Sequence, residues 1–267
     1  VSYAPSISLA HGVPVPVPCL PENGFAVTPE SIEKVITPKS KALVLNFPTN
    51  PTGGTMAYDG LKRIADLVKE HNLLVITDEI YSELTFEGDH ISIASLPGMA
   101  ERTIFLHGFS KAYAMTGFRI GYACGPPELI DAMMRIHQYS MLCASIISQD
   151  AAIEALENGT GPAAEMKDEF RNRRNYIVSA YNDMGLECQL PHGSFYAFPS
   201  VRTTGLSSNE FASKLVQQEE VACVPGNAFG ASGEGFLRCC FAVGFEQIKV
   251  ACERTSRFVN KIKTAGA

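Results

Sequence analysis

The stretch GFSKAYAMTGFRIG, residues 108–121, places a single lysine, Lys111, in a turn of small residues. An apolar run at 103–106 precedes this turn, and a second run at 119–124 follows it. Both runs predict strands that would hold the backbone of the turn within a sheet. An amine positioned in this way forms imines with carbonyl compounds. Taken alone, the stretch favours a simpler interpretation, a strand-turn-strand unit with a solvated lysine.

Polar side chains also follow two other predicted strands. The run ALVL at 42–45 leads into NFPTNPTGG, where proline and glycine end the strand and leave Asn50 at its carboxyl edge. The run LLVIT at 73–77 delivers Asp78 and Tyr81 to the same edge. Sheets of α/β proteins bind ligands there. Each residue also has a plainer interpretation, as a turn residue, a helix cap and a core side chain, respectively.

These strings, in this order, closely resemble the cofactor-binding motifs of fold-type I pyridoxal-phosphate-dependent aminotransferases of class I/II, the aspartate aminotransferase-like group. The resemblance covers the whole chain. It implies pyridoxal 5'-phosphate as the cofactor, and transfer of an amino group from an L-amino acid to a 2-oxo acid. It further implies a homodimer located in the cytoplasm.

The resemblance assigns catalytic roles to Lys111, Asp78 and Tyr81. Lys111 would tether the cofactor and then move a proton between the substrate α-carbon and the cofactor. Asp78 would keep the pyridine nitrogen protonated, which the electron sink requires. Tyr81 and Asn50 would donate hydrogen bonds to the phenolic oxygen of the cofactor.

Two further cofactor contacts are implied after the lysine. Arg119 would bind the phosphate, because a guanidinium fork suits a dianion better than a point charge does. Ser110 would be a second phosphate donor. Some relatives carry a serine at the position of Gly108 instead, which leaves the Ser110 contact open.

An arginine also lies within the apolar run GFLRCCFA at 235–242. A charge in such a run is costly unless it is paired, so Arg238 needs a carboxylate partner. The resemblance implies the α-carboxylate of the substrate, with Asn50 as a second substrate contact. An internal salt bridge to an acid such as Glu234 is the alternative.

Composition agrees with a cytoplasmic enzyme. The chain has 267 residues, of which 46% are hydrophobic, and a net charge of −6, which argues against nucleic-acid and membrane-surface partners. Its eight cysteines show no CxxC or Cys/His spacing, so we expect reduced thiols and no metal site. No signal peptide is visible, and no apolar stretch approaches the roughly 20 residues of a membrane helix.

The pattern along the chain predicts two domains. Residues 1–158 would form a large α/β domain, a three-layer α/β/α unit with a mostly parallel but incomplete sheet. A break at 158–162 would lead into a smaller α+β domain over 163–267. The expected strands of the first domain are 12–18, 41–47, 73–77, 103–107 and 119–124; the expected helices of the chain are 29–36, 58–70, one opening at Pro126-Pro127, 148–157, 163–184, 208–219 and 247–263.

The resemblance begins partway into the family pattern, which predicts an N-terminally truncated chain. Relatives have a sheet of order 3-2-4-5-6-7-1 with the seventh strand antiparallel, and the predicted strands correspond to the third through the seventh. The run at 12–18 would then lack its neighbour and be detached or re-paired. The phosphate-cradling turn would also be absent, which leaves the activity of this chain alone open.

Three other functions are compatible with parts of the pattern. Carbon–sulfur lyases and other pyridoxal enzymes share the lysine, aspartate and arginine motifs, and a non-catalytic sensor could keep the same fold. An α/β-hydrolase would use Ser110, followed by Asp131 or Asp183 and then His192. The string GFSKA lacks the final glycine of the hydrolase elbow, and His192 reads better as a surface residue.

Overall fold

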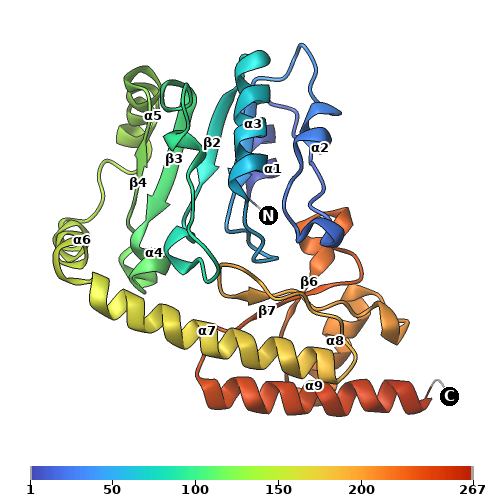
Figure 1. Ribbon diagram of the computed structural model, residues 1–267. Coiled ribbons are helices and arrows are strands. Elements are labelled where there is room, and N and C mark those ends of the chain that lie inside the picture. Colours follow the sequence, from blue (N-terminus) through green and yellow to red (C-terminus); the bar gives the residue numbers. More distant parts are fainter. Residues whose placement is uncertain (1, 266–267) are drawn as a thin grey trace.

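The computed structural model describes residues 2–265 and contains a four-stranded and a three-stranded sheet (Figure 1). The larger sheet has the order β1-β2-β3-β4, and its strands are β1 (Ala42–Asn46), β2 (Leu74–Asp78), β3 (Thr103–Gly108) and β4 (Gly121–Cys124). Strands β1, β2 and β3 are mutually parallel, and β4 is antiparallel to β3. The predicted α/β class, the mostly parallel sheet and the antiparallel last strand are therefore confirmed.

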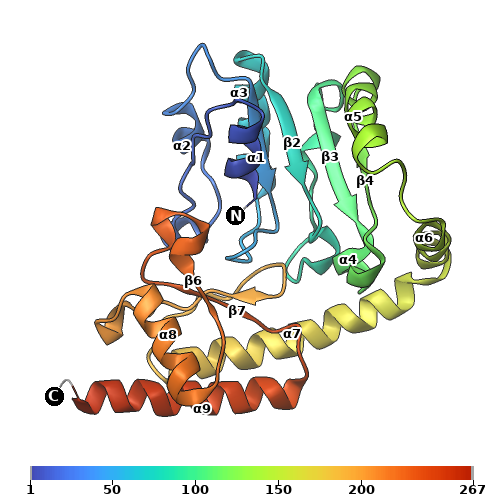
Figure 2. The same ribbon diagram turned by 180° about the vertical axis from the view of Figure 1, so that it is seen from behind.

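Helices cover the larger sheet from both sides. Figures 1 and 2 show α1 (Tyr3–Leu9) on the opposite face from α3 (Tyr58–Glu70). The apolar residues of α3 recur at helical spacing and are buried on the sheet, at positions Leu61, Ile64, Ala65 and Val68. The short α2 (Pro29–Glu33) packs beside α3, and the Thr28 hydroxyl caps it by accepting from the Ser31 amide at 3.2 Å.

The helices after β3 lead from one sheet to the other. They are α4 (Phe109–Ala112), α5 (Pro127–Ser140), α6 (Ile146–Asn158) and α7 (Thr160–Asp183), and α7 runs beneath the larger sheet toward the smaller one (Figure 1). The expected break at 158–162 was too long, since only Gly159 separates α6 from α7. Pro162 lies in the first turn of α7, where its missing N–H costs no helical hydrogen bond. The division into domains at this point stays a prediction.

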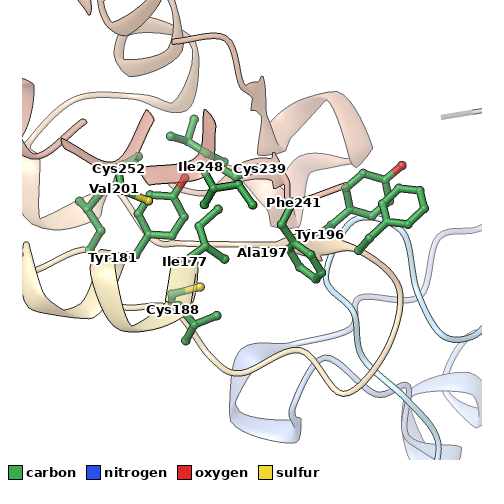
Figure 3. Close-up of a cluster of buried hydrophobic side chains, with 14 of the residues drawn as sticks. Ile177, Tyr181, Cys188, Tyr196, Ala197, Val201, Cys239, Phe241, Ile248 and Cys252 are labelled. Atoms are coloured by element: carbon green, nitrogen blue, oxygen red, sulfur yellow. The ribbon is translucent and has the colours of Figure 1, made fainter. Parts of the chain in front are cut away.

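The smaller sheet is antiparallel and has the order β5-β7-β6, with β5 (Tyr196–Ala197), β6 (Val224–Pro225) and β7 (Leu237–Cys240). Helices α8 (Ser208–Glu219) and α9 (Phe245–Ala265) pack with α7 around it. Figure 3 shows part of the resulting core, which joins side chains of α7, α9 and the sheet. Short 3-10 turns connect the elements of the fold at Pro21–Asn23, Ser82–Leu84, Ile93–Ser95, Ala100–Arg102, Thr116–Phe118, Arg202–Thr204, Gly226–Phe229 and Ala231–Gly233.

Two strand predictions need correction. Residues 12–18 form no strand and pair with no strand of the larger sheet, which agrees with the expectation that this run is detached. Pro14, Pro16 and Pro18 also lack the amide protons that one side of a strand must donate. The last strand starts at Gly121 and not at Arg119, since Arg119 has a left-handed backbone with φ 55° at the end of a 3-10 turn. The larger sheet therefore has β1 at one edge and β4 at the other.

The loop after β2 ties the two sheets together. Thr85 forms an antiparallel bridge with Gly193, and the Phe86 amide donates to the His192 carbonyl at 2.7 Å. Arg174 of α7 is only 2% exposed and stacks on the Phe86 ring at 4.9 Å. Its guanidinium also donates to the Glu87 carboxylate at 2.8 Å, so its buried charge is paired.

We predict that Ile64→Ala lowers the free energy of unfolding by about 2–5 kcal/mol, because Ile64 is fully buried between α3 and the sheet. Urea unfolding monitored by circular dichroism measures this loss. Lys62→Ala on the exposed side of the same helix is the matched control and should change stability by less than about 0.5 kcal/mol. Equal losses in the two variants would contradict the packing of α3.

Candidate active site

The carboxyl ends of the parallel strands β1, β2 and β3 lie side by side at one end of the larger sheet. Asn46, the last residue of β1, pairs with Asp78, and Asp78 pairs with Leu106 of β3. The Asn46 side chain donates to the Asp78 carbonyl at 3.0 Å and accepts from the Asn50 amide at 3.3 Å. Asn46 thus holds the loop carrying Asn50 against the end of β2, a role that the sequence reasoning missed.

Asp78 receives two hydrogen bonds. Its carboxylate accepts from the Ile80 amide at 3.2 Å and from the Tyr3 hydroxyl of α1. Burial, followed by the bond to Asp78, raises the pKa of Tyr3, so Tyr3 stays protonated and remains a donor. Tyr3 was also missed, because nothing in the sequence near either residue marks a contact across 75 positions.

Lys111 lies in α4, directly after β3, and is half-buried. Its Nζ lies 5.4 Å from the ring centroid of Phe195. No ion pair or hydrogen bond of its amine is present within residues 2–265. The amine is therefore held by an aromatic neighbour and is open to a carbonyl group.

Two glycines fix the turn that carries Lys111. Gly108 pairs with Gly121 across β3 and β4. A Cβ atom at Gly108 would lie 2.9 Å from the Gly121 Cα, and one at Gly121 would lie 2.8 Å from the His107 carbonyl oxygen. Because these neighbours are backbone atoms that cannot rotate away, only glycine allows the two strands to approach this closely.

Tyr81 is buried and contacts the smaller sheet. Its hydroxyl lies 3.3 Å from the Tyr196 hydroxyl, and the rings of Tyr81 and Phe195 meet edge to face at 5.3 Å. Burial, and then the bond to Tyr196, raises the pKa of Tyr81, which keeps it a proton donor. Tyr81 therefore belongs to the core and also directs a hydroxyl at the boundary between the sheets.

Arg238 of β7 reaches across to the larger sheet. Its Nη1 donates to the Asn50 side-chain oxygen at 2.9 Å, and its guanidinium carbon lies over the rings of Tyr196 and Phe229, 4.4 and 4.9 Å from their centroids. Its Nε is buried and has no hydrogen-bond partner among the described residues. The alternative partner, Glu234, instead accepts from the Ser208 amide at 2.8 Å, so the proposed internal salt bridge is wrong.

Arg119 and Ser110 lie farther along the turn. Arg119 is exposed, and its Nη1 donates to the Thr116 carbonyl at 2.9 Å. The Ser110 carbonyl accepts from the Thr116 hydroxyl at 3.0 Å. Within the described part of the chain, no hydrogen bond joins either side chain to Asp78 or Lys111. The structure thus groups Asn50, Asp78, Tyr81, Lys111 and Arg238 where the two sheets meet. Arg119 and Ser110, which were expected to bind a phosphate, lie in the adjoining turn.

A mostly parallel α/β sheet that brings an amine, an acid and an arginine together where it meets a second sheet is an arrangement suited to a group-transfer enzyme. The family model "Aminotransferase class I and II" matches residues 1–254. The chain belongs to this family, and its reaction is amino-group transfer. Members of the family generally depend on pyridoxal phosphate.

Individual relatives agree with this assignment. "Putative aminotransferase YugH" of Bacillus subtilis is 48% identical over 98% of this chain and 68% of its own length. "Aromatic-amino-acid aminotransferase 2" of Thermococcus litoralis is 41% identical over the same shares. The solved structure of an aromatic aminotransferase from Pyrococcus horikoshii superposes with a TM-score of 0.96 at 42% identity, covering 98% of this chain and 71% of that one. The chain thus spans about two thirds of these relatives, which do not favour the lyase or hydrolase alternatives.

We predict that Gly108→Ala destabilises the fold by about 1–3 kcal/mol, because the added methyl group must displace the backbone of β4. Thermal unfolding measures the change. Gly117→Ala, in the same turn region but with no atom within 4 Å of its added Cβ, is the control and should be close to neutral. A Gly108→Ala protein as stable as the control would show that β3 and β4 separate easily.

Proposed function

We propose that this chain binds pyridoxal phosphate at the carboxyl ends of β1, β2 and β3 and moves an amino group from an L-amino acid to a 2-oxo acid. The half-buried amine of Lys111, with no acidic partner among the described residues, is the observation that carries this proposal. The surrounding donor set fits the cofactor: an amine for its aldehyde, a carboxylate for its ring nitrogen, and hydroxyl and amide donors for its phenolic oxygen.

Asp78 is suited to hold a proton on the ring nitrogen. The Tyr3 hydroxyl donates to Oδ2 of Asp78 and the Ile80 amide donates to Oδ1, so the two donors fix the carboxylate in one orientation. When bound, pyridoxal phosphate supplies an electron sink for the electron pair left at the substrate α-carbon. A fixed negative charge beside the ring nitrogen favours the protonated ring and so strengthens that sink.

Lys111 would serve first as the covalent tether and then as the base. The Lys111 amine, once freed by the incoming amino acid, would be placed to move a proton at the substrate α-carbon. The Phe195 ring beside Nζ excludes water from this side. Asn50 and Tyr81 would donate to the phenolic oxygen, and Arg119 and Ser110 would bind the phosphate.

Arg238 would bind the α-carboxylate of the amino acid. Its guanidinium contacts the rings of Tyr196 and Phe229, and its hydrogen bond to Asn50 leaves further N–H donors to form a fork with a carboxylate. Asn50 would thus touch both cofactor and substrate. The unpartnered, buried Nε is consistent with a ligand that completes the hydrogen bonds of this guanidinium.

We further propose a homodimer in the cytoplasm. Large apolar side chains are exposed together along α5, α6 and the loop between them, as expected of an interface: Ile136, Tyr139, Met141, Leu142, Ile146 and Ile147. None of the described cysteines forms a disulfide, which suits a reducing compartment. No helix within residues 2–265 has the length and apolar character needed to cross a membrane.

We predict that Lys111→Ala abolishes amino transfer, with a loss of at least ~10²–10⁴-fold for the missing base and more for the missing tether. Amino transfer between an amino acid and a 2-oxo acid gives the rate. Borohydride treatment followed by mass spectrometry should attach the cofactor to the parent protein and not to the variant. Lys62→Ala, on the exposed face of α3, is the control and should keep the parent rate and the adduct. A Lys111→Ala variant with more than about a tenth of the parent rate would exclude the proposal.

We predict that Asp78→Asn slows turnover by about 10–100-fold or more, the effect of losing a hydrogen bond to a charged group, while cofactor affinity falls much less. Titration with pyridoxal phosphate gives the affinity, and single-turnover rates at saturating cofactor give the chemistry. A variant that loses affinity but turns over normally once saturated would refute the electronic role of Asp78.

A further inference from the structure

Tyr196 lies at the boundary between the two sheets and has been assigned no contact with cofactor or substrate. It begins β5, pairs with Cys240 of β7, and is 7% exposed. Figure 3 shows it at the end of the buried cluster opposite Tyr181. Its ring therefore belongs to the core around the smaller sheet, whereas its hydroxyl lies where the two sheets meet.

The hydroxyl of Tyr196 faces Tyr81 of the larger sheet. The two oxygens are 3.3 Å apart, and the rings are arranged edge to face with centroids 6.0 Å apart. Neither hydroxyl makes another hydrogen bond within residues 2–265. Each hydroxyl has a single proton, so only one of the two can donate to the other.

The ring of Tyr196 faces Arg238. The guanidinium carbon lies 4.4 Å from the ring centroid, within the range of a cation–π contact, and the Phe229 ring makes a second such contact at 4.9 Å. This stacking sets the plane in which Nη1 reaches Asn50. Tyr196 thus contacts both Tyr81, which is proposed to bind the cofactor, and Arg238, which is proposed to bind the substrate carboxylate.

We propose that Tyr196 is a positioning residue for amino transfer, its hydroxyl directing the Tyr81 proton toward the cofactor and its ring orienting Arg238 for the substrate carboxylate. The proposal rests on the function proposed above. If Tyr81 donates to the phenolic oxygen, the remaining partner for its own oxygen is the Tyr196 proton. A hydroxyl that accepts one hydrogen bond becomes a stronger donor in the next, so the pair polarises in one direction.

Two substitutions separate the hydroxyl from the ring. Tyr196→Phe keeps the stacking on Arg238 and removes the donor to Tyr81. The pH midpoint of the bound cofactor's absorbance should then rise by about 0.3–1 pH unit, the shift that one hydrogen bond produces, because a weaker donor favours the protonated form. The other titratable groups facing this site, Asp78, Lys111, Arg238 and Cys240, are unchanged in the variant.

Tyr196→Leu removes the ring as well. It should weaken binding of a non-reacting carboxylate analogue of the amino donor by about 2–30-fold, the range of a cation–π contact, whereas Tyr196→Phe should stay within about twofold of the parent. Equilibrium titration of the enzyme purified with its cofactor bound measures the dissociation constant of the analogue for each variant. Equal weakening in the two variants would refute the role of the ring.

Tyr181→Phe is the matched control, since it removes another buried tyrosine hydroxyl from the same cluster at its far end. It should leave both the pH midpoint and analogue binding unchanged. The Tyr81→Phe/Tyr196→Phe double variant should show no shift beyond that of Tyr81→Phe alone.

A Tyr196→Phe midpoint equal to that of the control, or a shift that persists in the Tyr81→Phe background, would overturn the proposal. The function itself is tested separately by Lys111→Ala. If that variant loses the borohydride adduct while Tyr196→Phe is silent, only the role of Tyr196 fails.

Discussion

The register of the three parallel strands is the constraint on which the candidate site depends. Because side chains alternate along a strand, a slip of one residue in β2 would exchange Asp78 with Glu79. Glu79 is 2% exposed and accepts hydrogen bonds from Thr77 and Ser92, with His90 paired to its other oxygen. A slip would break these hydrogen bonds of Glu79. The Glu79 network on one face of the sheet therefore keeps the Asp78 side chain on the opposite face.

The second requirement is the fixed contact between the two sheets. Arg238 can reach Asn50, and Tyr196 can reach Tyr81, only because the loop after β2 is bridged to the segment before β5. Arg174 stabilises this connection from beneath, and removing its Glu87 partner would leave a buried charge without compensation. The same contacts that hold the two sheets together therefore also align the groups proposed for cofactor and substrate.

Local sequence patterns were sufficient for much of the fold. The bounds of α3 and α8 match the predicted 58–70 and 208–219, because the amphipathic spacing of α3 and the capping box of α8 are both encoded within a few residues. Alternating apolar character misled at 12–18, where the prolines that remove amide protons outweigh strand propensity. The break at 158–162 was overestimated for a related reason, since Pro162 is tolerated inside the first helical turn.

The sequence by itself determined which residues come at or just after the strand ends: Asp78 ends β2, and Asn50 and Lys111 lie in the segments after β1 and β3, because the boundaries of these apolar runs are local and legible. Only the tertiary structure decided what surrounds them. Tyr3 and Asp78 are 75 positions apart, and Tyr81 and Tyr196 are 115 apart. Periodicity and turn chemistry act over a few residues, whereas these hydrogen bonds exist only after the chain has packed its sheets and helices together.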